Sequence, residues 1–403
     1  MDCALRESRK RNKLLDIIFY VLFVVFYNYH FMVTTMFYSE LLYVHAELFK
    51  NIYNYSYYAL LVLSFFSLLF LYDNIKTKLF PAAVIAVVLI YNHIREVSDF
   101  PVIAVFFMLV ICAKGKSYRV LGNLMLFFGW AWILASAIAC RLGVISDIVF
   151  YGTRHSFGSV YMTDLACHFL TLMMVLCIVR NGKMKIYDYG LGVLLMIVNL
   201  LFMKAKVGFA CLFLLLCGTY VYQYIIPRSL MRYGTRQTYK KICSFGILVL
   251  IPIVFYFTIT YSESPSMFYN RIGVLSTLRS RFMLGRQALD QYDITLWGVP
   301  IYERGNGGSK SGMVDNYFFI DISYLRILLM NGVFIWILTI LMFIKTQIRL
   351  ARENKLFLMF VVSVFLLDCS IEHHIVELAY SFMPYLLFCE LSSNNIRRMR
   401  PVV

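Results

Sequence analysis

The sequence predicts an all-α polytopic membrane protein of about 12 transmembrane helices. Hydrophobic residues make up 61% of its 403 residues and charged residues only 15%, whereas a soluble domain carries roughly 25% charged residues. The mean hydropathy is +0.72, and apolar runs close to the ~20 residues that cross a bilayer recur along the chain. Because so few charges cannot cover a water-facing surface, we expect lipid to cover most of the molecule.

The first apolar run follows a basic segment at the start of the sequence. Residues 1–13 contain five lysines and arginines, and no small-residue cleavage site follows the run, which favours a retained first span over a signal peptide. Further apolar runs follow, of which 101–113 is the weakest. The predicted spans are residues 14–35, 56–72, 80–94, 101–113, 120–140, 161–179, 187–203, 207–226, 242–261, 321–344, 356–370 and 377–391.

The basic residues orient these spans. With a cytoplasmic amino terminus, the predicted cytoplasmic segments hold 25 of the 38 lysines and arginines, as the retention of basic residues in cytoplasmic loops requires. The same bias accounts for the net charge of +16 without a nucleic-acid partner. We expect both termini in the cytoplasm and three regions: spans 1–9 in residues 1–261, an external loop in 262–320, and spans 10–12 with a cytoplasmic tail in 321–403.

The predicted external loop begins with an amphipathic helix. Its apolar stripe consists of Ile272, Leu275, Leu278, Phe282 and Leu289, which recur at helical spacing. Arg279 and Arg286 flank this stripe, and we place Arg281 on the opposite face. Such a helix is expected to lie along the membrane surface. The second half of the loop, residues 298–312, contains GNGGSKSG, which predicts a flexible segment and lacks the spacing of an ATP-binding loop.

Arginines gather on the predicted outer side. They are Arg154, Arg271, Arg279, Arg281, Arg286 and Arg304. A guanidinium group binds phosphate through two parallel hydrogen bonds and stays charged. The group therefore indicates either a phosphate-bearing substrate at the outer membrane surface or contact with anionic lipid head groups.

Carboxylates and histidines lie near the same helix ends. Arg154, His155, Asp164 and His168 surround the outer start of one span, where Asp164 and His168 share a helix face and either act on a substrate or pair with each other. Asp321 opens a later span, either as a general base or as a helix cap.

The run IEHHIVE contains Glu372, His373, His374 and Glu377 but no HExxH pattern. We interpret it as polar packing at the interface rather than as a metal site. None of the ten cysteines forms a CxxC motif, and they are interpreted as apolar packing residues.

Three blocks of the sequence resemble the Wzy-type polysaccharide polymerases, bacterial enzymes of capsule and O-antigen synthesis. The blocks are RHSFGSVYMTDLA (154–166), RSRFMLGRQALDQYDITLWGVPI (279–301) and DISYLRILLMNG (321–332). The second is similar to the family's arginine followed by "al..y...lfG", and the third to its acid or histidine followed by "YL..LL...G". Two positions depart from the pattern: Lys206 stands where the family often has an arginine, and Ile322 stands where it has an asparagine.

The resemblance implies an enzyme of the bacterial cytoplasmic membrane. It would join repeat units carried on undecaprenyl pyrophosphate at the outer face, as a metal-independent, inverting glycosyltransferase without a cofactor. Besides membrane lipid, its expected partners are these lipid-linked glycans, a flippase and a chain-length regulator.

The resemblance also implies roles for particular residues. Asp321 is the expected base, with His155, His168 and Asp315 as alternatives. The expected pyrophosphate ligands are Arg281 and Arg154, with Arg279 and Arg286 in support and Lys206 supplying charge without a bidentate fork.

Other functions remain open on the sequence alone. An O-antigen ligase shares this layout, although many ligases have histidine where this chain has Asp321. A lipid-linked oligosaccharide flippase or transporter also suits this length, although no internal repeat of the kind common in transporters is found. A scaffold protein would not need the arginines.

Overall fold

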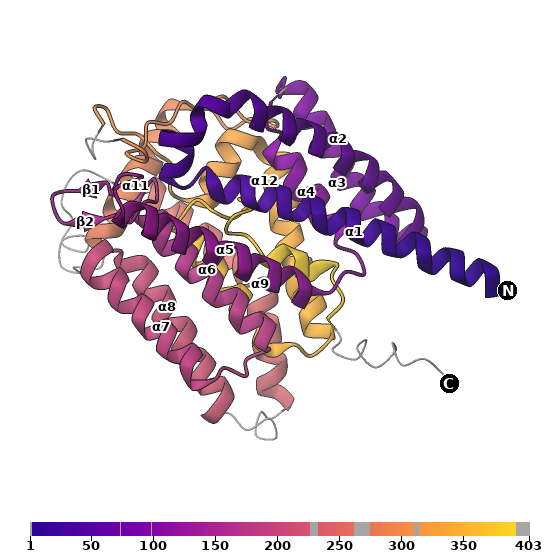
Figure 1. Cartoon of the computed structure of the whole chain (residues 1–403). Helices are drawn as coiled ribbons and strands as arrows, with labels where there is room; N and C mark the ends of the chain where they lie inside the picture. The colour runs from indigo at the N-terminus through magenta and orange to yellow at the C-terminus, as the bar shows by residue number, and fades with distance from the viewer. Residues whose placement is uncertain are drawn as a thin grey trace.

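The computed structural model describes residues 2–72, 74–97, 99–225, 233–261, 275–309 and 314–391. Within these ranges, residues 2–12, 233 and 275–277 are described by their backbone alone. The described chain is mostly helical (Figure 1). Nine helices within these residues are long and apolar enough to cross a membrane. The predicted class, an all-α multi-pass membrane protein, is confirmed.

The long helices form a ring around the core. Their bounds are α1 Asp2–Met32, α2 Ala46–Phe70 after the turns η1 Tyr38–Leu42 and η2 Tyr43–His45, α3 Ile75–Ile94, α5 Tyr118–Arg141, α6 Met162–Arg180, α7 Ile186–Val198 continued by η3 Asn199–Met203, α8 Lys206–Tyr220 continued by η4 Val221–Ile225, α9 Tyr233–Ile259 and α12 Ser323–Arg352. Neighbours in the ring include α1 with α5, α5 with α6, and α9 with α12. Large apolar side chains are exposed on α1, α2, α7, α8 and α9, as helices that face lipid require.

Two short elements lie inside the ring. The helix α4, Val102–Cys112, is buried from Ala104 onward, so its 11 residues do not have to match the thickness of a bilayer. The helix α13, Leu356–Asp368, contacts α8 and α9. The weakest predicted span is therefore a helix, but one that is enclosed by protein.

The last predicted span, 377–391, is not a helix. After α13 the chain runs irregularly, with a single five-residue 3₁₀ turn, η5 Met383–Leu387. It returns to the other end of the bundle, where Gly115 N donates to Phe388 O at 3.2 Å. Irregular backbone is tolerated at membrane depth only inside protein, and this return segment (residues 369–391) is almost entirely buried. Hydropathy predicted its apolar character but not its conformation.

The predicted amphipathic helix is present as α11, Leu275–Gln291, packed against α9. Its inward face is wider than the predicted stripe: Leu284, Gly285 and Ala288 are buried as well as Phe282 of the stripe, and Arg281 points inward with them, its side chain only 10% exposed. Placing Arg281 on the opposite face was wrong. Ile272 and Arg271 lie outside the described residues.

A glycine pair joins the loop after α11 to α12. Gly298 and Gly332 both have positive φ, 78° and 85°, and Gly332 interrupts α12 with a kink. Val299 N donates to Leu329 O at 2.9 Å, and Val333 N donates to Thr295 O at 3.1 Å. A Cβ on Gly332 would collide with the backbone of Gly298. The second and third sequence blocks therefore meet at their glycines.

Candidate functional site

A cavity of about 390 Å³ opens at one end of the bundle. The starts of α6, α8 and α12 meet there, together with α11 and the hairpin β1 Val149–Phe150 and β2 Arg154–His155 (Figure 1). Its charged lining residues are Arg154, Lys204, Lys206, Arg281, Asp321 and Glu372, and its tyrosines are Tyr151, Tyr161 and Tyr317. Four of the nine site residues predicted from sequence thus meet in one cavity: Arg154, Lys206, Arg281 and Asp321.

Arg281 holds two carboxylates on one side of this cavity. Its Nη2 lies 2.5 Å from Glu372 Oε1, and its Nε lies 3.7 Å from Asp321 Oδ2. The same Nε donates to Ile371 O at 2.7 Å. Burial by itself would lower the pKa of Arg281, but the carboxylates of Glu372 and Asp321 more than compensate and raise it. The guanidinium therefore remains charged between two acids.

Asp321 is a carboxylate between two arginines that does not cap α12. Burial raises the pKa of its carboxyl above the usual range, while Arg281 and Arg326 oppose this shift. The N-cap position of α12 is Ile322, and no side chain caps the helix there. The capping interpretation of Asp321 is therefore wrong.

Cations form the other side of the cavity. Arg154 donates from Nε to Met203 O at 2.9 Å, and its two terminal nitrogens have no hydrogen bond or ion pair to any described residue. Lys204 takes a left-handed conformation, with φ of 50°, in the turn between the π-helical η3 and the first residue of α8, Lys206. The free N–H groups and the dipole at the start of α8 add to this positive charge. The arrangement suits an anion.

The other predicted site residues lie outside the cavity lining. His155 Nδ1 pairs with Asp147 Oδ2 at 2.7 Å. His168 is buried between the rings of Phe31 and Tyr380, with its Nε2 2.8 Å from Thr34 Oγ1, so its partner is not Asp164. The remaining three are Asp315, which is exposed, Arg279, which donates to Tyr261 Oη at 3.3 Å, and Arg286, which pairs with Asp290 at 2.8 Å.

Sequence reasoning missed Glu372 and Lys204. Glu372 belongs to IEHHIVE, which was interpreted as interfacial packing, but Glu372 and His374 are buried. The signal was present, because three ionisable residues in a row rarely enter an apolar region without a partner. Lys204 is two residues before Lys206 and could have been noticed as part of the same basic turn.

Histidine, cysteine and carboxylate groups also cluster at the wall of the cavity, where Cys167 and Glu372 line it. His374 Nδ1 pairs with Glu377 Oε2 at 3.0 Å, and His373 Nε2 lies 3.4 Å from Glu377 Oε1. Cys167 of α6 lies close to Glu372 and His374, so these three side chains could share a metal ion.

Comparison of the chain with protein families, with curated proteins and with solved structures gives no match. The site itself therefore carries the functional assignment. It brings cations that suit an anion and two carboxylates together within one cavity at the end of a helical bundle.

Proposed function

We propose that this chain is a bacterial polysaccharide polymerase that joins oligosaccharide repeat units carried on undecaprenyl pyrophosphate at the outer face of the cytoplasmic membrane. One observation carries the proposal. Arg154, Arg281 and Asp321 come from the three separate blocks that resemble the Wzy-type polymerases, and all three line a single cavity. Convergence of the blocks is what a shared catalytic site requires, whereas a scaffold protein has no need of it.

The cavity separates the two tasks of an inverting glycosyl transfer. An acceptor hydroxyl oxygen attacks the anomeric carbon of the growing chain, and the bond from that carbon to the pyrophosphate oxygen breaks. We assign the departing pyrophosphate to Arg154, Lys204 and Lys206, since preorganised cations stabilise charge that develops in the transition state. The hydroxyl proton goes to Asp321 as general base.

Arg281 is assigned a place between these two halves. Its guanidinium already contacts Glu372 and Asp321, so it fixes the carboxylates, and it borders the cavity from which the pyrophosphate would leave. A lysine could not reproduce this arrangement, because it presents a point charge rather than a planar fork. Arg281→Lys should therefore be impaired along with Arg281→Ala.

The location of the cavity suits a lipid-linked substrate. The polyprenyl chain can remain in the bilayer while the pyrophosphate and sugars enter at the end of the bundle. The outer face is proposed because alternate basic segments, which hold 25 of the 38 lysines and arginines, favour the cytoplasm for the opposite end.

The direct test uses the purified chain in lipid vesicles with lipid-linked repeat units. We expect a ladder of polymers, and a loss of roughly 10- to 100-fold in rate for Arg154→Ala and Lys206→Ala, the size expected for a charge-assisted contact to an anion. Arg141→Ala is the matched control, because Arg141 is exposed at the end of α5 and does not line the cavity.

Other products would refute the proposal and identify the alternatives. A single transfer of finished glycan to a different acceptor would indicate a ligase. Movement of the substrate across the vesicle membrane without a new glycosidic bond would indicate a flippase. A full ladder from Arg154→Ala and Lys206→Ala would remove the pyrophosphate assignment.

A further inference from the structure

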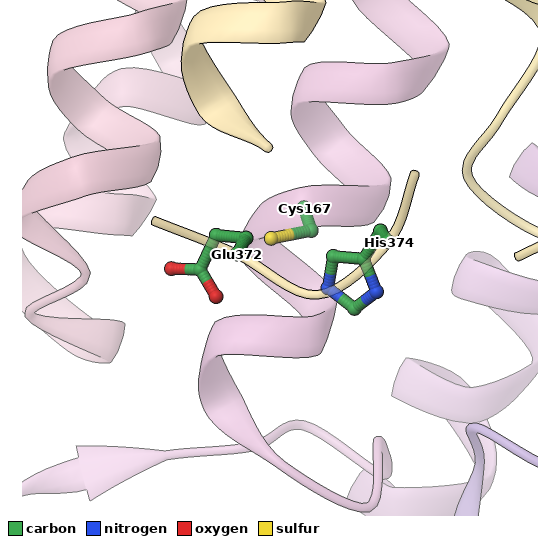
Figure 2. A group of neighbouring side chains, drawn as sticks. All are labelled: Cys167, Glu372 and His374. Atoms are coloured by element: carbon green, nitrogen blue, oxygen red, sulfur yellow. The ribbon is translucent and has the colours of Figure 1, made fainter. Parts of the chain in front are cut away.

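Three buried side chains lie next to one another at the wall of the cavity (Figure 2). Cys167 comes from α6, and Glu372 and His374 come from the return segment. A ligating atom from each lies within 4.8 Å of the other two. All three residues are at most 3% exposed, and no disulfide involves Cys167.

His374 has one ring nitrogen without a partner. Its Nδ1 is held by Glu377 at 3.0 Å, whereas its Nε2 is buried and has no hydrogen bond to any described residue. In Figure 2 the imidazole turns one nitrogen toward Cys167 and Glu372. A carboxylate on one nitrogen and an empty position at the other is the arrangement found around metal-bound histidines.

We propose that Cys167, Glu372 and His374 bind a divalent cation of the zinc class. Thiolate, imidazole and carboxylate are together the ligand set that suits zinc, and a fourth position would be left to water. In an occupied tetrahedral site the ligand atoms lie roughly 3.5 Å apart, so the cluster would have to contract by about 1 Å.

The neighbouring charges are compatible with a cation. Glu372 Oε1 accepts a hydrogen bond from Arg281. No described hydrogen bond uses Glu372 Oε2, which is therefore assigned to the metal. Glu377 and Asp321 add negative charge around the cluster, against the positive charge of Arg281 and Arg326.

The ion would serve to join two elements. Glu372 and His374 lie in irregular backbone after the end of α13, and the metal would tie both residues to α6. By fixing Glu372 it would also fix Arg281. The inference does not depend on the proposed reaction, because metal can be measured without any substrate.

Cobalt(II) is the probe, since a thiolate ligand gives it a charge-transfer absorption that nitrogen and oxygen ligands do not give. The full chain in nanodiscs is stripped with a chelator and titrated with cobalt. We expect the charge-transfer band to saturate at about one equivalent per chain, and zinc to displace it. The band should vanish in Cys167→Ala and in His374→Gln.

Cys177→Ala is the matched control. Cys177 is also buried in α6, but its sulfur contacts Met184 and Thr219, so this variant should keep the band. Absence of the charge-transfer band from the wild-type chain would by itself overturn the proposal. A band that survives Cys167→Ala would equally overturn it, by placing the metal elsewhere. Size-exclusion profiles of the variants report whether they remain folded.

Discussion

Asp321 and Glu372 share one arginine, and their contacts with it differ. Glu372 makes the shorter contact, at 2.5 Å, and Asp321 the longer, at 3.7 Å. Burial raises the pKa of both carboxyls, that of Glu372 to about 8, so the choice between them rests on their contacts with Arg281. Asp321, held more loosely in the same cavity, is therefore the better candidate base.

The base assignment predicts a particular dependence on pH. A general base acts in its deprotonated form, so activity should rise as the pH increases through the pKa of Asp321. Burial raises that pKa, so the rise should lie above the ordinary value of about 4. Asp321→Asn should lower the rate by about 100-fold or more and remove this limb of the profile. Polymer formation by the purified variant, measured across a pH series, checks both expectations.

Normal polymer ladders from Asp321→Asn would show that another residue is the base. Glu372 would be the next candidate because it lines the same cavity, ahead of His155 and His168, which do not. Membrane levels of Asp321→Asn must match the wild-type chain, and they should, since asparagine is nearly isosteric and Asp321 does not cap α12.

At the scale of elements, the break in α12 positions the site. Val299, in the chain between α11 and α12, donates to Leu329 before the kink at Gly332. Val333, just after the kink, donates to Thr295 in the same connecting chain. The loop that follows α11 is thereby fixed to the same helix that begins just after Asp321. Arg281 on α11 and Asp321 before α12 are thus connected by a rigid contact as well as by their charges.

This contact predicts that Gly332→Ala is strongly destabilising. Gly332 has a φ of 85°, and an added Cβ would collide with Gly298, so we expect a loss on the order of 1–3 kcal/mol. Gly246→Ala in α9 is the control, because nothing lies within 4 Å of its added Cβ and alanine favours a helix by about 1 kcal/mol. Thermal unfolding of both variants in detergent measures the difference. Equal melting temperatures would show that the glycine contact is dispensable.

The elements also show what hydropathy can and cannot predict. The apolar segments were found, including α4 and the return segment, but an apolar run looks the same whether lipid or protein covers it. For α11 the apolar stripe indicated a buried face, but Arg281 also points inward because it forms ion pairs with Glu372 and Asp321. That partner set comes from segments far away in the sequence, so no local pattern could reveal it.

At the scale of the whole molecule, the alternation of helices brings the site residues to one end. Arg154, Lys204 and Asp321 lie between helices, and Lys206 begins α8, all at the end opposite the Asp2 end of α1 (Figure 1). The sequence could predict this grouping from basic residues and helix order. The pairing of Arg281 with Glu372 required the fold, because Glu372 was expected only in a short loop between spans 356–370 and 377–391, with no stated partner.

The proposed sidedness predicts the outcome of labelling in intact cells. Tyr302→Cys should react with a membrane-impermeant thiol reagent from outside, since Tyr302 is 78% exposed at the site end. Lys183→Cys, exposed between α6 and α7 at the other end, should react only after the membrane is opened. The chain without either substitution provides the background. The opposite pattern would place the cavity in the cytoplasm and exclude a reaction at the outer face.

The irregular path of residues 369–391 has a consequence for how the protein is made. A helix can leave the translocation machinery and rest in lipid by itself, but this segment cannot, because its backbone polar groups need protein around them. We therefore expect it to pack only once α4 and α12, which contact η5, have assembled. Glu372 and His374 belong to this segment, so we expect the cavity to be completed only when it packs.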